Sequence, residues 1–151
     1  MMIFTRLELK NFKSHADTIL DFNPGISLIV GENGAGKSSI FEAISFALFK
    51  SYTTKSINDL VRSNKNTGDK IQMIVRLSFV SNGIEYMVER TITLTKSGSK
   101  PTSSLYKIVD GEAEIIVSGN KEVDKEIEII LSMDSSTFLN AIHIRQGEIA
   151  E

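Results

Sequence analysis

The sequence predicts an α/β fold with an antiparallel β insertion, and three observations predict it. A short apolar segment at residues 26–30 leads into a glycine-rich turn at 31–36, and an amphipathic helix follows from Lys37. Apolar and polar residues alternate across 71–80, which is the period of a strand with one buried face. Asn82-Gly83 comes directly afterwards, and this dipeptide is the strongest short signal for a β-hairpin.

Length and composition fit one domain or one large lobe with a real core, because the chain has 151 residues of which 41% are hydrophobic. It contains no cysteine, which excludes disulfides and thiolate zinc sites within it. Seventeen basic against nineteen acidic residues give a net charge of −2, so charge identifies no partner and gives no support for nucleic-acid binding. The longest apolar run is far short of the roughly 20 residues of a membrane span, and no signal peptide is visible. We expect a protein of the cytoplasm, nucleoid or nucleus, neither secreted nor membrane-bound.

The N-terminal elements are predicted from local patterns. Residues 3–12 predict a strand with Ile3, Leu7 and Leu9 on one face, and 18–22 predict a second strand. Residues 26–30 predict a strand buried on both faces. The helix after the glycine-rich turn has an apolar face made of Ile40, Phe41, Ile44, Ala47 and Leu48.

The second half predicts hairpins and a further helix. Residues 51–69 read mostly as loop, 96–103 as a longer turn containing Gly98 and Pro101, and Asp110-Gly111 as a second hairpin turn. An amphipathic helix is expected over 121–131, where the inward residues are Val123, Ile127, Ile130 and Leu131. Beyond it we expect a short helix capped by Ser135 or Ser136 and a strand at 141–144.

Residues 31–38 match the phosphate-binding motif G-x-x-x-x-G-K-[ST] at every specified position. Glycines let successive backbone N–H groups point into one concavity, and the following helix N-terminus adds partial positive charge. In such a loop the lysine, Lys37, reaches the β- and γ-phosphates, and the Ser38 hydroxyl ligates Mg²⁺. Because the motif follows an apolar strand and opens a helix, it predicts a nucleotide-binding site.

ATP is the expected nucleotide. Guanine recognition usually requires N-K-x-D, and the two near matches at 64–67 and 120–123 both lack the final Asp. Phosphoryl transfer in this class also needs a Mg²⁺-binding acid after an apolar strand. Neither Asp110 nor Asp134 follows such a run. The sequence therefore predicts the nucleotide-binding half of an ATPase.

Three segments resemble the head domains of SMC-like ABC ATPases: residues 9–15, Pro24-Gly25-Ile26 together with the loop and helix of 33–44, and residues 138–149. The last of these resembles the Q-loop of one branch, the DNA double-strand-break-repair ATPase that works with a partner nuclease. The resemblance implies an ABC-type P-loop NTPase fold. It also implies that residues 1–151 form the N-terminal lobe of a head, with the P-loop at 31–38 and the Q-loop at 145–147.

The resemblance also implies roles for single residues. Lys37 and Gln146 are the candidate catalytic residues, and Ser38 and Gln146 are the candidate Mg²⁺ ligands. The nucleotide-binding set comprises Lys13, Asn33, Gly34, Ala35, Gly36, Lys37, Ser38, Ser39 and Arg62. Lys13 stands where the family often has Arg, and Arg62 is aligned by loop position alone. His15 and His143 are expected to be structural.

The resemblance implies a further half of the molecule. In the family, a long coiled coil follows the Q-loop, and a C-terminal lobe, absent from this chain, brings the signature and Walker B motifs. The ATP sites form between two heads, so the isolated chain is expected to bind ATP without turnover. The implied cofactors are ATP and Mg²⁺, with zinc only at a hook outside this chain. The implied partners are the C-terminal lobe, a second head, a repair nuclease and DNA, but no membrane.

Three other interpretations stay open on the sequence. The chain could be the head lobe of a chromosome-organising SMC protein or of a recombination mediator. A self-sufficient P-loop kinase or small NTPase would need a Walker B acid or lid arginines within the chain. A nucleotide-sensing module that binds ATP without hydrolysis is the third.

Overall fold

The computed structural model describes residues 2–13, 15–22, 34–52, 56–62, 71–132 and 137. The strands are β1 (Met2–Phe12), β2 (His15–Asp21), β3 (Ile71–Ser81), β4 (Ile84–Thr95), β5 (Gly98–Val109) and β6 (Glu112–Ser118). The helices are α1 (Gly34–Phe49), the short 3₁₀-helix η2 (Ile57–Leu60) and α2 (Asn120–Leu131).

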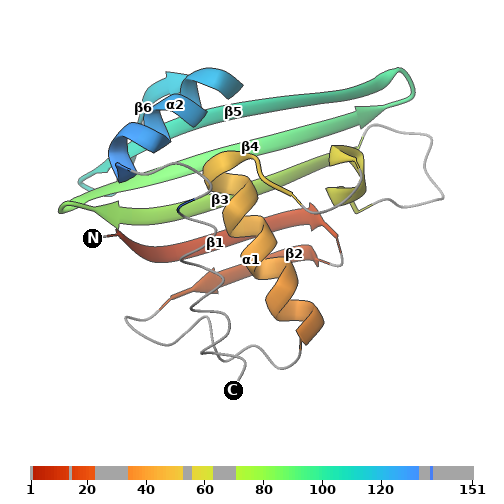
Figure 1. The fold of residues 1–151 in the computed structure, drawn as a ribbon, viewed down its shortest axis with the longest axis horizontal. Helices are drawn as coiled ribbons and strands as arrows, with labels where there is room; N and C mark the ends of the chain where they lie inside the picture. Colours follow the sequence, from red (N-terminus) through yellow and green to blue (C-terminus); the bar gives the residue numbers. More distant parts are fainter. Residues whose placement is uncertain are drawn as a thin grey trace.

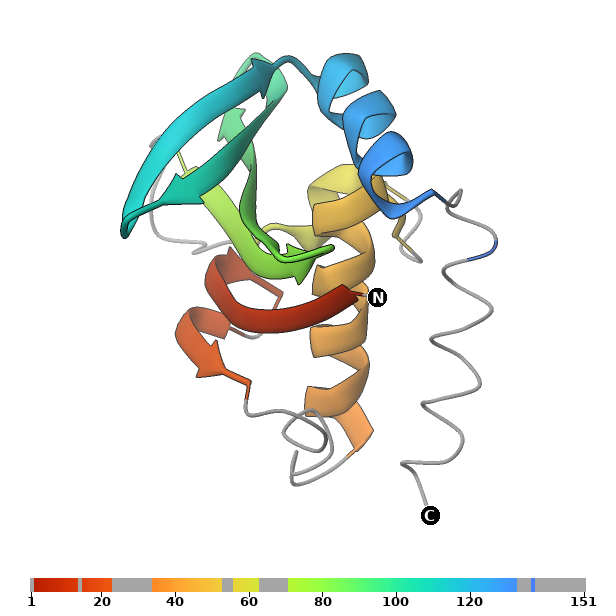
Figure 2. The same cartoon turned by 90° about the vertical axis from the view of Figure 1, so that its left-hand side faces the viewer.

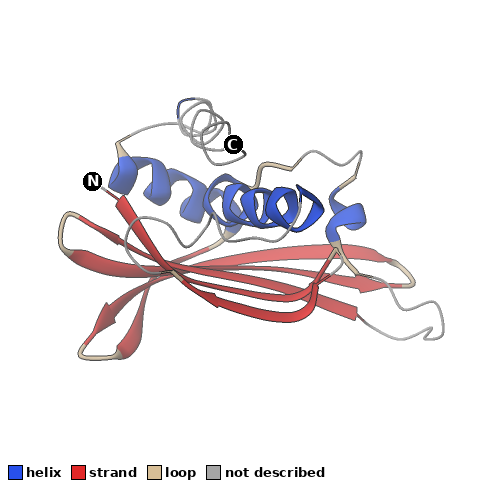
Figure 3. Ribbon diagram, turned by 90° about the horizontal axis from the view of Figure 1, so that it is seen from below, coloured by secondary structure: helices blue, strands red, loops and turns tan. Residues whose placement is uncertain are grey.

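The six strands form one antiparallel sheet in the order β2-β1-β3-β4-β5-β6. Both long helices lie on the same face of this sheet (Figure 3). α1 crosses its middle and α2 covers the β5–β6 end (Figure 1). The predicted α/β class is confirmed, and the strands predicted as an insertion continue the N-terminal hairpin, because β3 pairs with β1.

The predicted inner face of β1 is correct for Leu7 and Leu9, which are fully buried, and wrong for Ile3, which is 45% exposed. The reason is a register shift between Phe4 and Arg6 in the pairing of β1 with β3. A bulge of this kind reverses which side chains face inward. Phe4 packs against the core in place of Ile3.

β3 follows its predicted alternation: Met73, Val75, Leu77 and Phe79 are buried against the helices. The predicted hairpin is also present, since β4 returns directly after Asn82-Gly83. Asn82 has φ 51° and Gly83 φ 79°. Positive φ at both central residues is the requirement of a type I′ turn, whose twist matches that of the strands.

The long turn predicted over 96–103 is wrong, because β5 already begins at Gly98 and Pro101 lies opposite Ile92 within the ladder. The carbonyl of Pro101 accepts a 3.2 Å hydrogen bond from the amide of Asn120, at the start of α2. A strand residue directs its N and its C=O to the same side. The proline nitrogen therefore faces away from β4, beyond the end of β6, where no ladder bond is lost.

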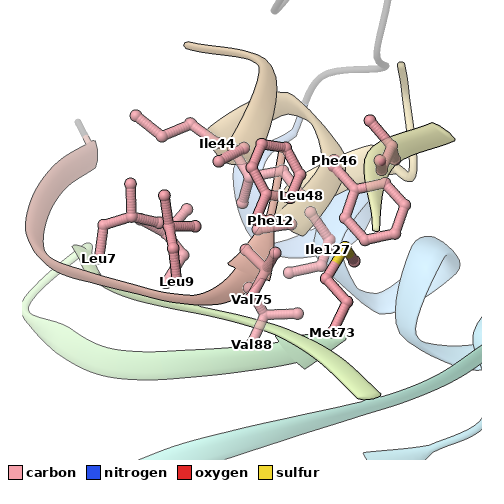
Figure 4. Packing of buried hydrophobic residues seen from close by; sticks show 14 of the residues in the cluster. Leu7, Leu9, Phe12, Ile44, Phe46, Leu48, Met73, Val75, Val88 and Ile127 are labelled. Carbon is pink, nitrogen blue, oxygen red and sulfur yellow. The ribbon is translucent and has the colours of Figure 1, made fainter. Parts of the chain in front are cut away.

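α1 begins at Gly34, three residues before the predicted start, and from Phe41 to Leu48 it is buried on every side rather than on one face. Every residue from Phe41 to Leu48 is buried. The sheet covers one side, and α2 lies next to the C-terminal end of the helix (Figure 2). Figure 4 shows Ile44, Phe46 and Leu48 of α1 packed among side chains of β1, β3 and β4. A helix that is mostly apolar and buried on every side is expected to be a central one.

α2 agrees with its prediction: Val123, Ile127 and Leu131 are buried. The strands predicted at 26–30 and 141–144 lie outside the described residues. Of the short helix predicted to end at Leu139, only Thr137 is described, and it is helical. Among the helices that are described, none is long and apolar enough to cross a bilayer.

Candidate nucleotide-binding site

The phosphate-binding motif coincides with the N-terminus of α1. Residues 34–38 form the first turn of that helix. The first four N–H groups of an α-helix have no partner within the helix, so they are free to bind an anion. The first turn contains no acidic residue to oppose one. This donor set fits a phosphate group, and the hydroxyl oxygen of a serine is a ligand type that Mg²⁺ accepts.

Several predicted site residues lie outside what the structure describes. These are Asn33, Gln146 and the side chains of residues 34–38, Lys37 and Ser38 included. Their predicted contacts with phosphate and Mg²⁺ stay predictions. Ser39, the last residue predicted to wrap the phosphates, is buried in α1.

Lys13 is placed beside α1 by the tight turn between β1 and β2. Its backbone has φ 51°, and its N–H donates a 2.7 Å hydrogen bond to the carbonyl of Leu60. Its ammonium forms an ion pair with the carboxylate of Glu42, one helical turn after Ser38. The structure therefore brings Lys13 to the phosphate-loop helix, although 20 or more residues separate them in sequence.

Arg62 lies on a segment that runs against the same turn. Its backbone N–H donates a 2.7 Å hydrogen bond to the carbonyl of Asn11, and Phe12 and Val61 form an isolated β-bridge. The stretches that carry Lys13 and Arg62 are thus paired through their backbones. This pairing places the two segments side by side, and of the two predicted nucleotide contacts Lys13 also contacts α1, through Glu42.

Glu42 is the functional candidate that the sequence reasoning missed. Its side chain is 7% exposed, within the buried run of α1. A buried carboxylate needs a partner, because an unpaired charge in an apolar surrounding is strongly unfavourable. The signal in the sequence is an acidic residue inside the apolar stretch from Phe41 to Ile44. Such a residue indicates that a cation from another part of the fold lies beside it.

The opposite end of α1 is closed by Arg90 of β4, whose side chain is fully buried. Its Nε and Nη2 donate to the carbonyls of Ala47 and Leu48 at 2.8 and 2.9 Å, and its Nη1 donates to the Ser103 hydroxyl at 3.0 Å. Asp124 of α2 lies 2.8 Å from Nη2. Burial lowers the pKa of Arg90, and the charge of Asp124 partly offsets this.

His15 begins β2, in the turn that carries Lys13. Its Nδ1 lies 3.0 Å from the Thr18 hydroxyl. Its Nε2 is buried and has no hydrogen-bond partner among the described residues. Burial lowers the pKa of the imidazole. The expectation that His15 is structural stays a prediction.

Comparison with known proteins agrees with this arrangement. A family model described as an AAA domain matches residues 6–150. The DNA double-strand break repair Rad50 ATPase of Methanocaldococcus jannaschii is 39% identical over 99% of this chain and 14% of its own length. That of Thermoplasma acidophilum is 37% identical over 98% of this chain and 16% of its own. The chain thus spans about a seventh of the relatives it matches.

A solved structure of the recombination mediator protein RecF in the RecFOR pathway shares the fold. It superimposes with a TM-score of 0.58 at 21% identity, over 81% of this chain and 29% of that one. At this identity the likeness supports the ABC-type ATPase fold alone. The family resemblance read from the motifs is confirmed by the sequence relatives. The chain belongs to the AAA-domain family of ATPases and is similar, over nearly its whole length, to the Rad50 ATPases of DNA double-strand break repair.

Proposed function

We propose that this chain is the N-terminal lobe of an ATPase head that acts in DNA double-strand break repair. It binds ATP at residues 31–38, and hydrolysis requires a C-terminal lobe and a second head. ATP binding then closes the pair of heads and hydrolysis opens it, a switch between two arrangements. The observation that carries the proposal is the start of α1 at Gly34, within the phosphate-binding motif.

Each predicted residue has a role in this proposal. Backbone N–H groups at the start of α1 and the Lys37 ammonium hold the phosphate oxygens, and Ser38 with Gln146 holds Mg²⁺. When bound, Mg²⁺ neutralises the charge that develops on the β- and γ-phosphate oxygens. Gln146 orients the attacking water. Lys13 and Arg62 contact the nucleotide, which the backbone pairing of their two segments beside α1 supports.

The proposed partners are DNA, a nuclease and a second copy of the head. The relatives are ATPases of DNA double-strand break repair, which supports DNA as a partner. The nuclease and the second head are taken from the family resemblance of the motifs. The proposed place of action is where DNA is found, in the nucleoid or nucleus. A recombination-mediator head is the alternative. The 21% identity with that structure is lower than the 39% with the repair ATPase, which favours the repair branch.

The test is the binding and turnover of Mg²⁺-ATP by the chain, with Lys37→Ala as the inactivating variant. Lys121→Ala is the matched control, because Lys121 is an exposed residue of α2, away from α1's N-terminus. We expect the chain to bind ATP, Lys37→Ala to weaken binding about tenfold or more, and the control to bind like the parent. Turnover is expected only after addition of the C-terminal lobe, together with ATP-dependent dimers.

Two results contradict the proposal. Steady turnover by the chain alone, abolished in Lys37→Ala, shows a complete active site and removes the half-head interpretation. ATP binding that is equal in Lys37→Ala and in the parent shows that residues 31–38 do not bind phosphate.

A further inference from the structure

The ion pair between Lys13 and Glu42 joins two parts of the chain that sequence alone does not connect. Glu42 lies in the buried run of α1 with a side chain that is 7% exposed, and the Lys13 side chain is 29% exposed. An ionised carboxylate this deeply buried is strongly unfavourable unless a cation lies beside it. The ammonium of Lys13 therefore remains next to α1 instead of extending into solvent.

The backbone of Lys13 is fixed as well. The residue has φ 51°, a left-handed conformation that few residues other than glycine adopt, and its N–H is bonded to Leu60. The preceding residue, Phe12, is fully buried. Lys13 is thus held at both ends, by η2 at its backbone and by α1 at its ammonium. A lysine held in this way loses less side-chain entropy when it contacts a ligand.

The held ammonium lies close to the phosphate-binding end of α1. Positions 38 and 42 are one turn apart, which is about 6 Å along the helix axis. An ammonium has three N–H donors, so an ion pair with one carboxylate leaves donors for an anionic ligand. Lys13 is therefore positioned to act on a group bound at the N-terminus of α1.

We propose that Glu42 is a positioning residue for the nucleotide site: through its ion pair it holds Lys13 in the place from which Lys13 contacts ATP. The inference rests on the proposed function. This positioning role differs from a purely structural role of Glu42 in one respect. A positioning role acts only through Lys13, whereas a structural role affects the lobe whether Lys13 is present or not.

The experiment is a double-mutant cycle on Mg²⁺-ATP binding by the chain. It compares the parent, Glu42→Gln, Lys13→Met and the double variant, with urea unfolding of each as the check on folding. Glu42→Gln keeps the shape of the side chain, and Lys13→Met keeps the apolar stem. Glu8→Gln is the matched control, since Glu8 pairs with Arg6 and Arg76 on the opposite face of the sheet.

We expect Glu42→Gln to weaken ATP binding about fivefold in the parent and to have no further effect in Lys13→Met, because the two residues act as one unit. The control should bind like the parent. Glu42→Asp keeps the charge on a shorter side chain, so it should bind better than Glu42→Gln. It also provides the same comparison if the Gln variant does not fold.

If Glu42→Gln weakens ATP binding equally with and without Lys13, or leaves it unchanged in both backgrounds, the inference is overturned and the proposed function stands. A parent chain that does not bind ATP, or that binds it independently of Lys37, overturns both.

Discussion

Arg90 and Leu48 connect the central strand β4 to the end of the phosphate-loop helix: Nη2 of Arg90 donates a 2.9 Å hydrogen bond to the carbonyl oxygen of Leu48. The last carbonyls of an α-helix have no intrahelical partner, and a cation near them interacts favourably with the helix dipole. The same guanidinium reaches Ser103 of β5 and Asp124 of α2. One side chain thus fixes the C-terminal end of α1 against both the sheet and α2.

Arg90→Met is expected to lower the free energy of unfolding by about 3 kcal/mol. The substitution fills the same space but leaves the carbonyls of Ala47 and Leu48 without their donors in a buried place. Arg90→Lys should recover only part of the loss, because an ammonium cannot reproduce the planar set of donors. Urea unfolding measures the free energy of unfolding of the parent chain and of the two variants.

Arg76→Met is the matched control for Arg90. Arg76 pairs with Glu8 and Glu89 on the open face of the sheet, with a side chain that is 39% exposed. Ion pairs of that exposure contribute about 1 kcal/mol or less. Equal losses in the two methionine variants would show that closing the end of α1 adds nothing to stability.

The hairpin glycines give a second prediction. Gly83→Ala should lower the free energy of unfolding by about 1 kcal/mol, because φ 79° is unfavourable for a residue with a Cβ. Apart from the two adjacent residues, the part of the chain that the structure describes has no atom within 4 Å of the position of that Cβ, so the loss comes from the backbone and not from a clash. Gly111→Ala is the matched variant, with φ 80° and equally open space. Equilibrium unfolding should give similar losses, and a neutral result at both positions contradicts the argument.

The regular strands could be predicted because burial on one side imposes a period of two on their sequences. β3 is the clearest case, since its inner residues Met73, Val75, Leu77 and Phe79 alternate without interruption. The prediction for Ile3 is wrong because a bulge in the pairing with β3 leaves no mark in the sequence of β1. The turn predicted around Pro101 is wrong because a proline whose nitrogen faces away from its partner strand fits a ladder.

The candidate site likewise has one part that the sequence predicts and another that it does not. The phosphate-binding motif is contiguous, so its glycines and Lys37 are visible in sequence, and the helix that follows them is present. Asn11 pairs with Arg62, 51 residues further along the chain, and Lys13 pairs with Glu42, 29 residues further along. Contacts of that range depend on how the sheet and α1 pack. No local pattern predicts them.

The packing of α2 gives the third prediction. Ile127→Ala should lower the free energy of unfolding by about 3 kcal/mol, since Ile127 is fully buried and the substitution leaves a cavity. Ile129→Ala is the matched control on the same helix, because Ile129 is 61% exposed, and it should change stability by about 0.5 kcal/mol at most. Thermal or urea unfolding distinguishes the two. Equal effects would mean that α2 does not pack on the sheet by the face described.

Stability should also depend on pH through His15, whose pKa burial lowers from its ordinary value of 6.5. Below about pH 6.5 the unfolded chain binds a proton at His15 that the folded chain does not. The stability that the neutral imidazole contributes is therefore fully present above that pH, and it is lost as the pH falls through the pKa of the folded state. Carboxylates titrate mainly below about pH 5, so unfolding measured between about pH 7.5 and 5.5 isolates the histidines. His15→Gln should remove most of the decline, and His143→Gln reports what the second histidine contributes. A decline that is unchanged in His15→Gln would show that protonating the buried imidazole costs the fold nothing.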